Sequence, residues 1–132
     1  MTFYPITEAD RELIAIAQEK IGGLFDENSY LHTVGAAVRC KDGKVYSGVN
    51  CDGIHGSCAE FITIGTAVSD GRRDFDTIVA VHREYPNGII APCGNCRQML
   101  LEYCPGIKVI LNDDENRLVK VGIRDLLPFA CL

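Results

Sequence analysis

The sequence predicts an α/β fold in three layers, with a mixed five-stranded sheet and helices on both faces. Helical and strand-like segments alternate in the order αββαβαββα. The first two strands are joined through Asp42-Gly43, and Asp-Gly is the strongest short signal for a hairpin. Residues 77–82 are apolar and β-branched without alternation, which is typical of a central strand buried on both faces. Helices before and after that strand can then cover its two sides.

The first helix is expected to begin at Thr7, whose side chain can cap it, with Asp10 at the reciprocal position of a capping box. Gly22-Gly23 should loosen or end this helix. Its apolar residues fall on one face: Leu13, Ile14, Ala17, Ile21 and Leu24.

The remaining elements follow from the same patterns. Strands are expected at 33–40, 44–48, 77–82, 107–111 and 118–121, and helices at 58–69, 94–103 and 123–127. Residues 48–57 read as a loop, 83–88 as a polar turn, and Pro128 halts the last helix.

Composition limits the classes of protein that the chain can represent. Its 132 residues suit a single domain spanning 1–132, and the net charge of −5 without a basic run argues against nucleic acid as a partner. Seven cysteines are an odd number, and no apolar signal segment precedes the domain. We therefore expect a cytoplasmic protein without a disulfide framework. No apolar run approaches the roughly 18 residues that span a membrane, so no membrane association is expected.

Two short stretches carry the predicted chemistry. Cys93 and Cys96 lie three residues apart, a spacing at which the first turn of a helix directs both sulfurs to one metal ion. Catalytic zinc takes three protein ligands and keeps its fourth position for water. Cys58 can supply the third thiolate, and Glu60, two residues later, can then reach the water instead of the metal. This pattern predicts one Zn²⁺ per chain in the three-cysteine site of a hydrolytic deaminase.

The cysteines also allow simpler interpretations. A lone Cys-x-x-Cys is more often a redox pair or half of a structural zinc site. A structural site normally has four protein ligands, and the nearby candidates Cys51, His55 and Cys104 do not repeat a ligand spacing. A thioredoxin-like pair would follow an early strand, whereas this pair lies late in the chain. A zinc module without catalysis stays open as the alternative class.

The combined motifs resemble the cytidine deaminase superfamily in its small single-domain branch. The resemblance rests on Cys-Ala-Glu at 58–60 and Pro-Cys-Gly-Asn-Cys-Arg-Gln at 92–98, and it extends from about Leu13 to Pro128. Residues 106–108 and 121–128 look closer to its blasticidin S deaminase members. The resemblance implies a cytidine deaminase-like fold, deamination of a small nucleoside, and a homotetramer with its sites near subunit contacts.

The resemblance also implies roles for single residues. Glu60 would carry the proton of the water to the ring nitrogen, while hydroxide attacks the carbon that bears the amine. Many small cytidine deaminases carry Arg after Cys-Ala-Glu, where it offsets thiolate charge, and this chain has Phe61 there. We expect the positive ends of two helices, together with Arg97, to supply that compensation.

The expected substrate-binding residues are Asn50, Asp52, His32 and Ala59. Asn50 matches a family Asn that holds ribose, Asp52 stands where the family has Glu, and His32 replaces an aromatic residue before the first strand. A carboxylate at Asp52 should disfavour blasticidin S, whose sugar is carboxylated. The sequence therefore favours cytidine or deoxycytidine, with blasticidin S or another aminopyrimidine nucleoside as the alternative. Editing of cytosine within nucleic acid is disfavoured by the acidic charge.

Overall fold

The computed structural model describes residues 1–85 and 87–131. Pro86, expected in the polar turn, lies outside them. The elements, in chain order, are β1 (Phe3–Tyr4), α1 (Glu8–Leu24), β2 (Val34–Cys40), β3 (Val45–Val49), α2 (Ala59–Ser69), β4 (Phe75–His82), β5 (Ile89–Ile90), α3 (Gly94–Tyr103), β6 (Lys108–Asn112), β7 (Leu118–Gly122) and the 3₁₀ helix η1 (Ile123–Leu126).

The strands form one mixed sheet in the order β1-β7-β6-β4-β2-β3. β4 and β6 run parallel, and the other pairs are antiparallel. The described residues contribute seven strands to this sheet, so the predicted count of five is wrong. The two additional strands, β1 and β5, are two residues long and pair with β7 and β4. Segments this short have no detectable alternation, and only the position of their partner makes them strands.

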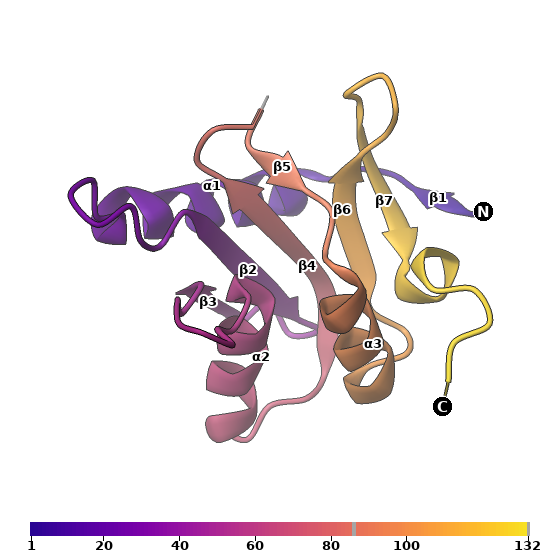
Figure 1. Ribbon diagram of the computed structural model, residues 1–132. Helices are drawn as coiled ribbons and strands as arrows, with labels where there is room; N and C mark the ends of the chain where they lie inside the picture. The colour runs from indigo at the N-terminus through magenta and orange to yellow at the C-terminus, as the bar shows by residue number, and fades with distance from the viewer. Residues whose placement is uncertain (86, 132) are drawn as a thin grey trace.

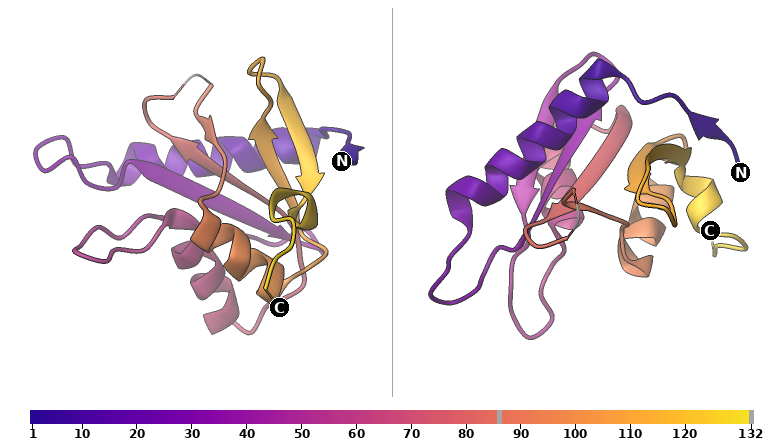
Figure 2. Two further views of the ribbon diagram at one scale, coloured as in Figure 1. Left: turned by 45° about the vertical axis from the view of Figure 1, so that its right-hand side comes forward. Right: turned by 90° about the horizontal axis from the view of Figure 1, so that it is seen from above.

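The three predicted layers are confirmed. α1 covers one face of the sheet, and α2 and α3 cover the other (Figures 1 and 2). One core cluster of buried side chains includes α1 residues packed on β2 and β4, and a second includes residues of α2 and α3. A Cβ on Gly35 would lie 2.6 Å from the carbonyl oxygen of Ala17, so glycine at this position of β2 lets α1 approach the sheet.

The helix boundaries follow the sequence signals closely. Thr7 caps α1, and both hydrogen bonds of the capping box with Asp10 are present. The helix continues through Gly22-Gly23 and ends at Leu24. α3 has its predicted bounds, and the last helix is a short 3₁₀ turn. Among the described residues, no helix has the length and apolar character needed to cross a bilayer.

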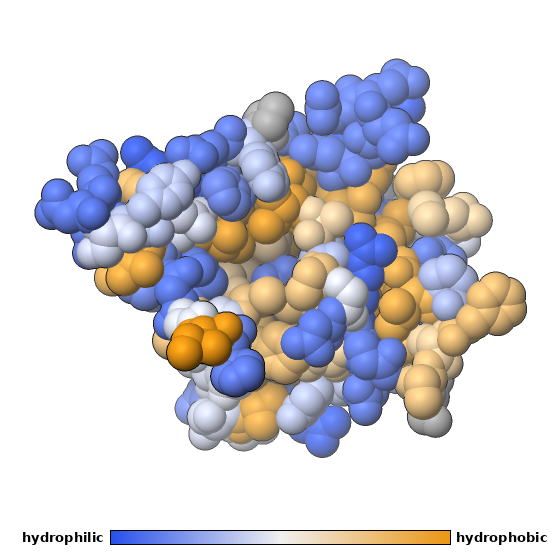
Figure 3. Space-filling view, in the orientation of Figure 1, coloured by the Kyte–Doolittle hydropathy of each residue, from blue (hydrophilic) through white to orange (hydrophobic). Residues whose placement is uncertain are grey.

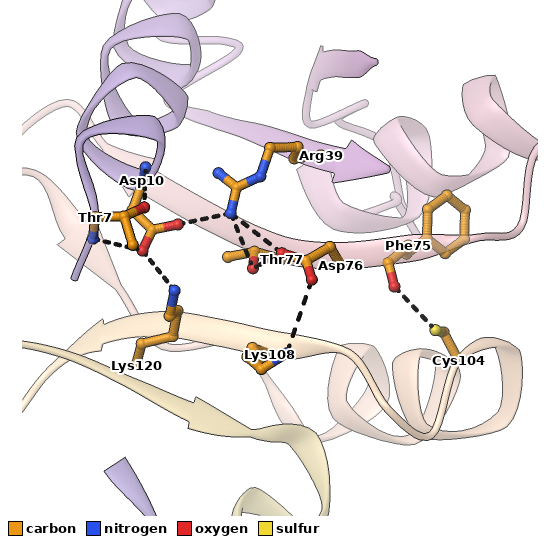
Figure 4. A network of polar contacts seen from close by, with 9 residues as sticks. All are labelled: Thr7, Asp10, Arg39, Phe75, Asp76, Thr77, Cys104, Lys108 and Lys120. Carbon is orange, nitrogen blue, oxygen red and sulfur yellow. Dashed lines mark hydrogen bonds and ion pairs between the residues drawn. The ribbon is translucent and has the colours of Figure 1, made fainter. Parts of the chain in front are cut away.

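A buried polar network joins α1 to the sheet (Figure 4). The Asp10 carboxylate is fully buried and accepts hydrogen bonds from the Arg39 guanidinium at 2.8 Å and the Lys120 ammonium at 2.6 Å. Arg39 also donates to Asp76, which pairs with Lys108 at 3.7 Å. Charged side chains from β2, β4, β6 and β7 thus converge beneath the start of α1, and each is paired with a side chain of opposite charge.

Candidate metal centre and active site

The two cysteine stretches meet at the N-terminal ends of α2 and α3, on the same face of the sheet (Figure 1). Cys58 is the N-cap of α2 and Cys93 the N-cap of α3, and Cys96 lies in the first turn of α3. The Sγ atoms of Cys58 and Cys93 are 3.7 Å apart. All three sulfurs lie within 4.8 Å of one another. The N-terminal ends of the two helices therefore bring the three cysteines together.

This cluster fits a zinc ion. Four ligands at the usual Zn–S distance of about 2.3 Å in tetrahedral geometry place neighbouring sulfurs about 3.8 Å apart. The observed separation of Cys58 and Cys93 is 3.7 Å. Among the described residues, no further His, Cys, Asp or Glu ligand atom joins the cluster. Three thiols without a fourth protein ligand match a catalytic zinc site and not a closed structural one.

The surrounding protein changes the acidity of the three thiols in different directions. Burial raises the pKa of the Cys58 and Cys96 thiols. At Cys93 burial acts in the same direction, but hydrogen bonds from the Cys96 and Asn95 amides and the neighbouring thiols lower the pKa below its usual value. Metal ligation requires the deprotonated form, and a bound cation would offset the charge of three adjacent thiolates.

Glu60 lies in the first turn of α2, two residues after Cys58, and is 3% exposed. Burial raises the pKa of its carboxyl. A carboxylate with a raised pKa exchanges protons more readily near neutral pH than a solvated one. Its burial beside the thiol cluster is compatible with the predicted role of a proton carrier, and that role stays a prediction.

Glu60 and two of the three cysteines, Cys58 and Cys93, line a cavity of about 440 Å³. The loop 50–57 forms another part of its wall. This loop is a short hairpin, closed by two main-chain hydrogen bonds between Cys51 and Ser57 at 2.9 and 2.8 Å. A volume of this size accommodates a small molecule.

Three of the four predicted substrate-binding residues line the cavity, and the fourth lies next to it in the hydrogen-bond network. Asn50, Asp52 and Ala59 line the cavity, and Ala59 is fully buried. His32 is not among the described residues that line it; its Nδ1 contacts the main-chain oxygen of Asn50 at 2.8 Å. Asn50 and Asp52 are hydrogen-bonded to each other, with 3.1 Å between the Asn50 amide nitrogen and an Asp52 oxygen.

Arg97 donates hydrogen bonds to two main-chain carbonyls, that of Pro92 at 2.7 Å and that of Leu126 at 3.0 Å. Arg97 thereby connects η1 with the loop that contains Cys93. Its expected role in offsetting thiolate charge stays a prediction. Phe61, which stands where many small cytidine deaminases carry arginine, lines the cavity and packs against the core.

Several lining residues were not predicted from the sequence. Val34, His55, Ile90 and Asn95 contribute to the wall. Asn95 lies inside the Cys-Gly-Asn-Cys motif, so its position was a usable signal. The other three reach the cavity from β2, the 50–57 hairpin and β5, and no local pattern marks them. His55 is the one lining residue among those described that can carry a positive charge.

Comparisons with known proteins agree with this geometry. Residues 8–111 match the family described as "Cytidine and deoxycytidylate deaminase zinc-binding region". The chain is 40% identical to blasticidin-S deaminase of Bacillus cereus, over 97% of this chain and 96% of that protein. It is 37% identical to cytidine deaminase of Sporosarcina psychrophila, over 74% and 73%.

Solved structures show the same likeness. Cytidine deaminase from Burkholderia pseudomallei superimposes with a TM-score of 0.75 and 31% identity, covering 92% of this chain and 98% of the other. The family match takes in Cys58, Glu60, Cys93 and Cys96, and the structural match extends over most of the sheet and its helices. With its thiol cluster in place for the metal, the chain belongs to the zinc-binding cytidine and deoxycytidylate deaminase family and is a zinc-dependent aminohydrolase.

Proposed function

We propose that this enzyme hydrolytically deaminates the cytosine base of a small nucleoside-type molecule. The observation that carries the proposal is the buried Glu60 beside three clustered thiols in a cavity of about 440 Å³. In the overall reaction, water replaces the exocyclic amine, and the products are the corresponding uracil compound and ammonia.

Each group of the site has a distinct part in this proposal. A zinc ion held by Cys58, Cys93 and Cys96 would supply a Lewis acid that activates water near neutral pH. Glu60 accepts a proton from the attacking water and passes it to the ring nitrogen, which makes the adjacent carbon electrophilic. After attack it carries the proton of the new hydroxyl to the amine, so that the C–N bond breaks and ammonia leaves. The burial that raises the pKa of Glu60 supports this shuttle, because these transfers need a group that gains and loses a proton easily.

Two substrates are supported by separate observations, and we place blasticidin S first. The similarity to blasticidin-S deaminase extends over 97% of the chain, whereas that to cytidine deaminase of Sporosarcina psychrophila extends over 74%. The expectation of cytidine depended on Asp52 binding sugar hydroxyls. Both oxygens of Asp52 already accept hydrogen bonds from the protein, which weakens that basis. Cytidine stays the second candidate because Asn50 lines the cavity.

The test is a comparison of kcat/KM for blasticidin S, cytidine and deoxycytidine with the zinc-loaded enzyme. We expect turnover of at least one of them, with the highest kcat/KM for blasticidin S. A preference for cytidine would reverse the order of the two candidates. Absence of turnover of all three by protein containing a full equivalent of zinc would contradict the proposed substrate class.

Glu60→Gln tests the proton shuttle within the same assay. The substitution keeps size and polarity but cannot carry a proton, so turnover should fall by about 10²–10⁴-fold while zinc content stays unchanged. Glu12→Gln is the matched control, because Glu12 is an exposed carboxylate on α1, on the opposite face of the sheet. Near-parental turnover by Glu60→Gln would mean that another group carries the proton.

A further inference from the structure

Asn50 extends the pairing of β2 and β3 with its side chain as well as its main chain. Its main-chain nitrogen donates to the Val34 oxygen at 3.1 Å, and its side-chain Oδ1 accepts from the Val34 nitrogen at 3.1 Å. Its Nδ2 donates to Oδ1 of Asp52, also at 3.1 Å. The amide of Asn50 is thus held from two sides at the wall of the cavity.

These two partners fix the orientation of the amide. A main-chain N–H can only donate, so the atom facing Val34 must be the oxygen of Asn50. An ionised carboxylate can only accept, so the atom facing Asp52 must be the nitrogen. Each partner alone would select the same orientation. A reversed amide would place its NH₂ group against the Val34 N–H and its oxygen against the Asp52 carboxylate.

Asp52 also holds the segment that precedes β2. Its Oδ2 accepts from the main-chain nitrogen of His32 at 3.1 Å. His32 has a φ of 62°, a left-handed conformation that a residue with a side chain rarely adopts without support. Its ring contacts the main-chain oxygen of Asn50 at 2.8 Å, so Nδ1 carries the proton and donates. The hydrogen bonds among His32, Asn50 and Asp52 therefore close a ring.

We propose that Asp52 is a positioning residue that acts through Asn50 and does not itself bind the substrate. With one N–H of the Asn50 amide donated to Asp52, the other is left to meet a hydrogen-bond acceptor in the cavity. That acceptor would be an oxygen of the sugar portion, either a hydroxyl or ring oxygen or a carboxylate. This inference rests on the proposed function and refines it. The Asn50 N–H would then recognise an oxygen of the substrate that accepts a hydrogen bond, and Asp52 would not accept a hydrogen bond from a substrate hydroxyl.

A double-mutant cycle separates positioning from direct contact. Asp52→Ala should lower kcat/KM by about 10-fold, mainly by raising KM, because a contact made equally in the bound substrate and the transition state changes KM and not kcat. In an Asn50→Ala background the same change should cost less than about 2-fold, because the two residues act as one unit. Losses that multiply in the double variant would overturn the proposal.

Asp52→Asn distinguishes the two roles in another way. An asparagine can still accept a hydrogen bond from a sugar hydroxyl, so direct contact predicts a milder effect than Asp52→Ala. Positioning predicts that Asp52→Asn loses as much activity as Asp52→Ala. The NH₂ group of the new asparagine would face an N–H donor, either that of the Asn50 side chain or that of the His32 main chain. We expect Asp52→Asn to be no better than Asp52→Ala. A substantially more active Asp52→Asn would contradict the proposal.

A measurement without substrate keeps this inference separate from the proposed function. In ¹⁵N NMR spectra of the zinc-loaded protein, the Asn50 side-chain amide can be assigned by its absence in Asn50→Ala. Its two proton signals should move and converge in Asp52→Ala, since one of them loses its acceptor. The control Asp114→Ala, at an exposed position in the turn between β6 and β7, should leave them in place. Unchanged Asn50 signals in Asp52→Ala would overturn the positioning role whatever the substrate is.

Discussion

At the scale of single residues, the three thiols of the metal centre occupy unlike environments. Cys96 is fully buried, Cys58 is half-buried and Cys93 is exposed. Burial raises the pKa of Cys96, so without a cation this thiol stays protonated inside the protein.

Replacing Cys96 by Ala should remove the zinc. Two remaining thiols leave the ion with too few protein ligands to hold it in tetrahedral geometry. Metal analysis of protein purified without added zinc should find one equivalent in the parent and close to none in Cys96→Ala. Cys131→Ala, which alters an exposed cysteine near the C-terminal end, is the control and should keep the full equivalent. A full equivalent in Cys96→Ala would show that this ligand assignment is wrong.

At the scale of elements, the helix N-termini place and stabilise the thiol cluster. α2 begins after Cys58 and α3 after Cys93, so the positive ends of both helix dipoles face the sulfurs. The Cys96 amide contacts the Cys93 sulfur at 3.5 Å. That these contributions offset thiolate charge, in a chain with Phe61 where many small cytidine deaminases have arginine, stays a prediction.

The start of α1 depends on a buried carboxylate. Burial alone would raise the pKa of Asp10, but hydrogen bonds from Lys120, the Thr7 amide and Arg39 outweigh it and lower the pKa below its usual value. Figure 4 shows these donors converging on the carboxylate. The charge of Asp10 is thus part of what attaches α1 to β2 and β7.

Asp10→Asn should destabilise the fold by about 3–5 kcal/mol, because it leaves the buried Lys120 ammonium without its partner. Urea unfolding of the parent and the variant measures this difference. Glu19→Gln, an exposed carboxylate on the same helix, should change stability little.

The contribution of the Asp10–Lys120 pair to folding stability should depend on pH in a predictable way. The pKa of Asp10 is lower in the folded than in the unfolded chain, so its contribution is complete above the unfolded value of about 3.9 and is lost as the pH falls through the folded value. The stability gap between parent and Asp10→Asn should be constant from pH 7 to about 5 and narrow below about 4. A gap that widens toward acid would contradict this role.

At the scale of the whole molecule, several large apolar side chains lie on the surface. Phe3 is 59% exposed and Phe129 is fully exposed. Figure 3 shows apolar residues gathered on the side where the N-terminal strand, η1 and the C-terminal segment lie. Exposed apolar surface of this kind is typical of a face that contacts another protein.

We expect a homotetramer in solution, as the family resemblance implies. Light scattering at micromolar concentration should report four times the chain mass of 14.5 kDa. Measurements across a dilution series would distinguish a stable assembly from a weak one. A monomer throughout that series would contradict the expectation.

The sequence by itself determined the metal chemistry and the order of the main elements. Cys93 and Cys96 could be found because their spacing encodes both a helix start and a ligand geometry. Cys58 and Glu60 were added through the combined deaminase motif; the cluster includes Cys58, and the role of Glu60 stays a prediction. The capping box at Thr7 and the bounds of α3 were predictable for the same reason. Signals of this kind lie within one helical turn, where propensity and capping act without the rest of the chain.

Only the tertiary structure decided which distant groups meet. β1 became a strand because the outer edge of β7 was open to it. β5 became one because Ala80 and Val81 of β4 extend beyond the residues that pair with β6. Asp52 accepts a hydrogen bond from the main-chain nitrogen of His32, 20 residues away, and no sequence pattern indicated this contact. Lys120 and Asp10 pair across 110 residues. Such contacts depend on the register of the sheet and the packing of helices on it, and no local pattern encodes them.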